Sequence, residues 1–148
     1  MDDAPETAGS LLADLCSRDT QRVWSAAWGV VRTEDEGVLD ALWPQLPRIE
    51  RRTADLDLGG GLASNNEVLE IALKTLRWRQ GGGCRCTLWP QFSRYDPNKL
   101  AERGAVQILS TSEPDYEMTY ECRCGRCGQT FHVEQREYHL PWWKWVPG

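Results

Sequence analysis

Apolar residues in the first eighty positions recur every three or four residues, which is the spacing of one face of an α-helix. One stripe follows Ser10, which is placed to cap a short helix, and the next begins within residues 17–20. Two later stripes follow residues 33–36 and 64–67, segments with the hydroxyl-to-glutamate spacing of a capping box. The pattern predicts short amphipathic helices joined by short connectors.

Residues 19–47 resemble one helical hairpin of the HEAT type, and Pro44 and Pro47 mark where a helix is expected to end or restart. An ordinary helical bundle fits equally well, because internal self-similarity reveals no second copy of the hairpin. Glycine runs at 59–61 and 81–83 lack the strand-to-helix context of a nucleotide-binding loop. Both are interpreted as turns, the second as a boundary between lobes.

After residue 84 the pattern changes to short runs rich in aromatic and β-branched residues, which predicts strands. These runs are residues 105–109, 116–123, 130–134 and 138–146, with turns expected at 96–98 and 112–115. The predicted fold class is α+β, a HEAT-like bundle of short helices packed on a small antiparallel zinc-binding sheet. Residues 1–9 are expected to be a flexible terminus, 10–81 the helical lobe and 82–148 a zinc-ribbon-like lobe, the two lobes forming one compact unit.

Composition and charge narrow the class of protein. The chain has 148 residues with a net charge of −5, and residues 1–80 hold 9 basic and 14 acidic side chains. It therefore lacks the basic surplus that phosphate neutralisation requires, which disfavours a nucleic-acid partner. The acidic N-terminus does not resemble a secretory signal, and no apolar run is long enough to span a membrane. A cytoplasmic protein without a membrane partner is expected.

Motifs for catalysis are absent from the sequence, which has no Walker A loop, no Gly-x-Ser-x-Gly elbow and no His-Glu-x-x-His pair. His132-Val133-Glu134 matches half of the zinc-deaminase signature, but it follows the paired cysteines instead of preceding them. The sequence thus predicts neither an enzyme nor a small-molecule substrate.

Paired cysteines give the strongest chemical signal, because clustered cysteines in a reducing compartment indicate a metal site more than disulfides. Cys124 and Cys127 lie in a glycine-containing knuckle, and Cys84 and Cys86 would face one side of an extended segment. Four thiolates form the tetrahedral ligand set of a structural Zn²⁺ and leave no open position for catalysis. We therefore predict one structural Zn²⁺, with disulfides or unliganded thiols as the alternatives.

The fourth ligand has alternatives among neighbouring residues. Cys122 lies two residues before Cys124 on the same side of a strand, and His139 follows the knuckle within reach. His132 is expected to pack or form a hydrogen bond rather than to bind metal. Cys16 lies among helical apolar residues and is expected to be a buried small side chain.

The chain closes on a run of tryptophans, in which Trp143 and Trp145 are expected on one face of a strand and Trp142 on the other. Most of this aromatic surface is interpreted as packing over the zinc lobe and towards the helices. An exposed subset would make an anchor for a protein partner.

Several segments together carry a family resemblance: residues 22–28, 57–61, 84–86, 124–129 and the tryptophan-rich end. Over residues 10–145 the chain resembles immunity proteins encoded beside bacterial polymorphic toxins. The resemblance implies a non-catalytic protein that binds and neutralises one cognate toxin domain. A zinc-ribbon adaptor and a nucleic-acid-binding regulator are the alternatives, the latter using Arg85, Arg94, Arg123 and Arg126.

Overall fold

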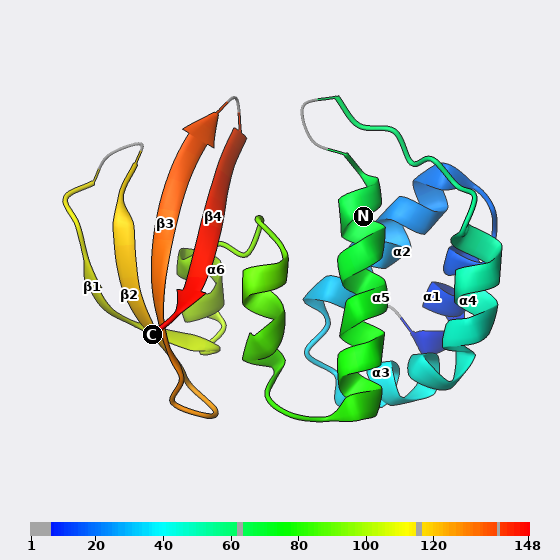
Figure 1. Cartoon of the computed structure of the whole chain (residues 1–148). Coiled ribbons are helices and arrows are strands. Elements are labelled where there is room, and N and C mark those ends of the chain that lie inside the picture. The colour runs from blue at the N-terminus through cyan, green and yellow to red at the C-terminus, as the bar shows by residue number, and fades with distance from the viewer. Residues whose placement is uncertain (1–6, 62–63, 115–116, 139) are drawn as a thin grey trace. The chain divides into compact units, whose positions relative to one another are not determined.

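The computed structural model describes residues 7–61, 64–114, 117–138 and 140–148 (Figure 1). It confirms the α+β class, with helices and one four-stranded antiparallel sheet. The chain divides into two compact units, residues 1–83 and 84–148, at the end of the second glycine run. Most of the terminus expected to be flexible, residues 1–6, lies outside the described residues.

Unit 1 is helical and contains α1 (Ala8–Leu15), α2 (Thr20–Arg32), α3 (Glu36–Leu42), the 3-10 helix η1 (Trp43–Gln45), α4 (Leu46–Thr53) and α5 (Asn66–Gly81). The longest helices, α2 and α5, pack against each other, and α1 packs on α2 (Figure 1). The stripes read from the sequence form this core, because Val23, Leu39, Leu42, Val68 and Leu76 are fully buried. Burying each such side chain stabilises the fold by roughly 1.5–3 kcal/mol. The HEAT-like repeat remains a prediction.

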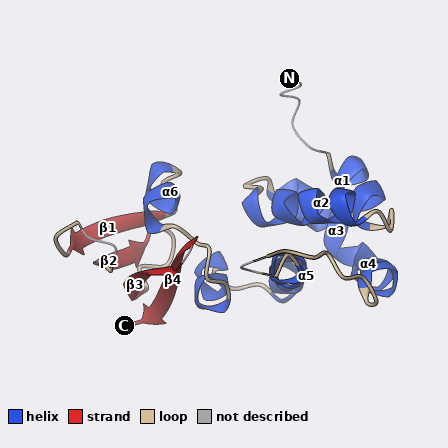
Figure 2. Ribbon diagram, turned by 90° about the horizontal axis from the view of Figure 1, so that it is seen from above, coloured by secondary structure: helices blue, strands red, loops and turns tan. Residues whose placement is uncertain are grey.

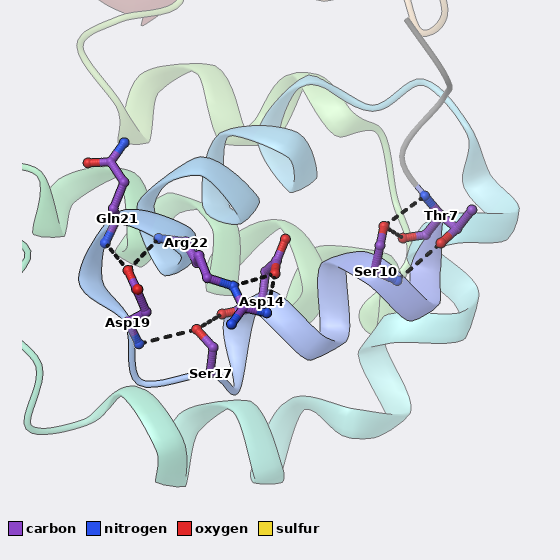
Figure 3. Close-up of polar contacts among 7 residues, drawn as sticks. All are labelled: Thr7, Ser10, Asp14, Ser17, Asp19, Gln21 and Arg22. Atoms are coloured by element: carbon purple, nitrogen blue, oxygen red, sulfur yellow. Dashed lines mark hydrogen bonds and ion pairs between the residues drawn. The ribbon is translucent and has the colours of Figure 1, made fainter. Parts of the chain in front are cut away.

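The first helices begin at polar side chains that satisfy their free backbone N–H groups (Figure 3). Thr7, and not Ser10, caps α1. The two residues bond reciprocally, since the Ser10 N–H donates to Thr7 Oγ1 at 3.1 Å and the Thr7 N–H donates to Ser10 Oγ at 3.2 Å. Asp19 caps α2 by accepting hydrogen bonds from the N–H groups of Gln21 and Arg22.

Neither of the two predicted capping boxes forms. Asp35 caps α3 in place of Thr33, because its carboxylate accepts from the Gly37 N–H at 2.9 Å. The cap position of α5 is Asn65. Its backbone is already helical, and its side chain makes no capping hydrogen bond to the first turn. Ser64 Oγ instead accepts from the Asn66 N–H. These two helices were predicted, but not the residues that cap them.

Pro44 and Pro47 act as the sequence predicts. α3 ends at Leu42, and each proline occupies one of the first positions of the helix that follows, η1 or α4. A proline lacks the N–H that would be unpaired at a helix start, so these positions accept it without loss.

Unit 2 contains η2 (Arg85–Gln91), α6 (Pro97–Glu102), β1 (Val106–Thr111), β2 (Thr119–Cys124), β3 (Thr130–Tyr138) and β4 (Leu140–Pro147). The strands follow one another across the sheet in chain order, and all neighbours are antiparallel (Figure 1). Residues 96–98 do not form the predicted turn, because Asp96 accepts from the Asn98 N–H and so starts α6. α6 packs beside β1 (Figure 2).

One face of the sheet is buried by aromatic side chains. The Trp89 ring, from η2, lies 5.0 Å from the ring of Trp145 and 5.5 Å from that of Phe131, measured between centroids. Trp145 Nε1–H donates to the Tyr95 carbonyl at 2.8 Å, so its polar atom is satisfied. Trp142 lies on the opposite face, as the alternation predicts.

The outer edge of β4 is closed to further strand pairing. Pro141 and Pro147 cannot donate a backbone hydrogen bond, and the Trp143 N–H donates to the Ser93 carbonyl at 2.8 Å. In the described residues, no helix is both long and apolar enough to cross a lipid bilayer.

Candidate metal centre

Four cysteine sulfurs converge in unit 2. The Sγ atoms of Cys84, Cys86, Cys124 and Cys127 all lie within 4.8 Å of one another. Cys84 Sγ is 3.6 Å from Cys124 Sγ, and Cys86 Sγ is 3.5 Å from Cys127 Sγ. Sulfurs at these separations can surround a single metal ion, and soft thiolates favour thiophilic metals.

The knuckle that carries two of these sulfurs is built at the end of β2. The Cys124 N–H donates to the Gln129 carbonyl at 2.8 Å, and the Gly128 N–H donates to the Cys124 carbonyl at 3.1 Å. Gly128 has φ +79°, a left-handed conformation that favours glycine. The Arg126 N–H points at Cys124 Sγ, 3.4 Å away, and would stabilise a thiolate there.

Gly125 fixes the knuckle against the start of β1. Its N–H donates to the Ala105 carbonyl at 2.9 Å, and a Cβ on this residue would lie 3.0 Å from the Gly104 carbonyl oxygen. The backbone crossing therefore leaves no room for a side chain.

Gly125→Ala is expected to push the knuckle away from β1, cost about 1–3 kcal/mol and weaken metal binding. Urea unfolding and competition with a chromogenic chelator would measure the two effects. Gly81→Ala is the control, because nothing lies within 4 Å of a Cβ at the end of α5. Equal metal affinity in the two variants would show that the close approach at Gly125 does not shape the site.

Cys84 and Cys86 do not form the extended segment that the sequence suggested. Cys84 is extended, with φ −85° and ψ 139°, but Cys86 lies in the first turn of η2. Both the N–H and the hydroxyl of Thr87 donate to the Cys84 carbonyl, at 3.2 and 3.0 Å. This turn, rather than strand alternation, brings the two sulfurs to one site.

The surroundings of Cys84, Cys86 and Cys127 shift their thiol pKa values in different directions. Burial and the adjacent thiols raise the pKa of Cys86, and burial raises the pKa of Cys84. The Gln129 N–H and the Cys86 thiol lower the pKa of Cys127 to about 7. A metal ion that binds all four as thiolates must therefore displace protons, so its affinity falls as the pH is lowered.

The other candidate ligands lie elsewhere or outside the described residues. Cys122 is completely buried opposite Phe131 on β3, burial raises its pKa to about 11, and it does not belong to the four-sulfur group. His132 Nδ1 lies 2.5 Å from a Glu121 carboxylate oxygen. Cys16 is buried in unit 1. His139 is not among the described residues.

Strand alternation correctly puts Cys122 and Cys124 on one face but cannot separate their roles. The two cysteines differ because β2 ends at Cys124, after which the chain turns and brings Cys127 Sγ close to Cys124 Sγ.

Comparison of the chain with protein-family models, curated proteins and solved structures gives no match.

Proposed function

We propose that the chain is an immunity protein that binds and neutralises a cognate bacterial toxin domain, without catalysis and with one structural Zn²⁺. The observation that carries the zinc proposal is the convergence of four sulfurs from two segments about forty residues apart. Four thiolates complete the tetrahedral set that Zn²⁺ prefers in structural sites. No ligand position is then left for water or substrate, which supports a binding role.

An exposed stripe on β4 supports a protein partner. Leu140 and Val146 are 44% and 40% exposed, and the half-buried Trp142 and the exposed Lys144 lie between them on the same face. Because Pro141 and Pro147 close the edge of the strand, contact at this stripe is made by side chains and not by an added strand. Tryptophan is enriched among the residues that contribute most to binding at protein interfaces, so Trp142 is the proposed anchor of this contact.

The acidic charge of unit 1 supports a basic toxin domain as the partner. Its first 80 residues carry 14 acidic and 9 basic side chains. An acidic surface accelerates capture of a basic protein, such as a toxin that acts on nucleic acid. We therefore place a basic toxin domain first among the candidate partners.

Co-expression with the toxin domains encoded beside the gene in its host tests this function. We expect one of them to arrest growth alone, to permit growth with the immunity protein, and to co-purify with it. Rescue from none of the neighbouring toxins would refute the proposal. Salt-dependent binding to oligonucleotides would favour the regulatory alternative instead.

Within such a complex, Leu140→Ala and Trp142→Ala are each expected to weaken toxin binding by about tenfold, or about 1.4 kcal/mol. Leu109→Ala is the matched control, because this leucine is 42% exposed but lies on β1, at the opposite edge of the sheet. Isothermal titration calorimetry measures the affinities. If Leu109→Ala weakens binding as much as Leu140→Ala, the β4 stripe is not the contact surface.

A further inference from the structure

We propose that the cysteine cluster is also a site of oxidative modification, at which hydrogen peroxide converts the thiolates into the disulfides Cys86–Cys127 and Cys84–Cys124 and releases the metal ion. The inference rests on the zinc site proposed above. In the oxidised form, disulfide bonds instead of a metal ion join the two segments that carry the cysteines.

Peroxide reaches the cluster at Cys127. This residue is exposed, whereas Cys86 and Cys124 are buried and Cys84 is half-buried. Oxidation of a cysteine follows the accessibility of its thiolate. Cys127 is therefore the sulfur that reacts first.

Distance selects the partner of each sulfur. Cys86 Sγ lies 3.5 Å from Cys127 Sγ, and Cys84 Sγ lies 3.6 Å from Cys124 Sγ. An S–S bond is about 2.05 Å long, so each pair must close by only about 1.5 Å. A disulfide between Cys84 and Cys86 would instead enclose a single residue and disturb the first turn of η2.

The chemistry balances with one peroxide for each disulfide. The Cys127 thiolate attacks the O–O bond, becomes a sulfenic acid and releases hydroxide, which a proton converts to water. The Cys86 thiolate then attacks the sulfenic sulfur, forming the S–S bond and expelling a second hydroxide, which also becomes water. Two sulfurs lose two electrons, and the peroxide gains them. The same steps join Cys84 to Cys124.

The two disulfides preserve the connection that the metal makes. Each joins the start of η2 to the knuckle, across sequence separations of 40 and 41 residues. Cross-links that close long loops restrict the unfolded chain and so stabilise the folded one. We therefore expect the oxidised unit to lose its metal but keep its fold.

Peptide mapping tests the pairing directly, because Arg85, Arg123 and Arg126 separate the cysteines of unit 2 into different tryptic peptides. Zinc-loaded full-length protein is titrated with hydrogen peroxide while a chromogenic chelator reports free zinc. We expect release of one zinc ion per chain as two peroxides are consumed, with an unchanged circular dichroism spectrum. Mass spectrometry without reduction should then find residues 80–85 linked to 124–126 and residues 86–94 linked to 127–136.

Cys122→Ala is the matched control, because this cysteine lies outside the cluster and should leave both linkages intact. Disulfides within each segment, linkage to Cys122, or sulfinic acid at Cys127 without a disulfide would each overturn the inference. A protein that binds no zinc would refute the proposed metal. The peptide map of that metal-free protein after peroxide would still decide the pairing, so the two failures are distinguishable.

Discussion

Replacing Cys124 or Cys127 by serine is expected to abolish metal binding and to unfold much of residues 84–148. A serine hydroxyl does not replace a thiolate as a zinc ligand, and three remaining sulfurs hold the ion weakly. Zinc binding contributes about 10–16 kcal/mol in small zinc-dependent peptides. The whole stability of an ordinary domain is about 5–15 kcal/mol, so this loss is enough to unfold unit 2.

Elemental analysis and amide NMR spectra of the purified variants measure the two effects. Cys16→Ser and Cys122→Ala serve as controls, since both cysteines lie outside the four-sulfur group. Each should retain one zinc ion per chain. Stoichiometric zinc in Cys124→Ser, or unmodified protein without zinc when purified under reducing conditions, would contradict the structural metal.

Phe131→Ala is the second large effect that we expect, with a loss of about 3–5 kcal/mol in the stability of unit 2. Phe131 is 2% exposed, and its ring lies 5.5 Å from the centroids of both Trp89 and Trp145. Truncation leaves a cavity between η2 and the sheet that these rigid rings cannot fill. Urea unfolding of the zinc-loaded protein, followed by tryptophan fluorescence, measures the loss.

Trp142→Ala is the control for this prediction. It removes a larger aromatic side chain from the same sheet, but from the opposite and half-exposed face. We expect it to cost much less than Phe131→Ala. Similar losses for the two variants would mean that burial on the η2 side does not determine the stability of this unit.

Periodicity predicted the fold class because it reports which side chains are buried. The stripe through Val23 and Val30 is a buried helix face, and the alternation through Phe131 and Val133 is a buried strand face. Helix starts were predicted less well, since several hydroxyl and acidic residues compete within one turn. Asp35 displaced Thr33 in this competition, and Thr7 displaced Ser10.

The first part of unit 2 shows where local pattern fails. η2 and α6 were not predicted, because these short helices are stabilised by tertiary contacts, such as Trp89 against the sheet. The four cysteines could be chosen from their clustering and the glycines around Cys124. Their convergence depends on the turn at Cys86 and on the crossing at Gly125, which no spacing in the sequence reveals.

The separation of the two cysteine pairs also affects how the protein is made. Cys86 leaves the ribosome 41 residues before Cys127. At about 5–20 residues per second, the early pair waits roughly 2–8 s for its partner sulfurs. During that interval nascent chains expose two thiols that cannot yet complete a metal site. Binding of the proposed metal ion would therefore follow synthesis of the knuckle, and unit 1 has already emerged in full when unit 2 begins to close.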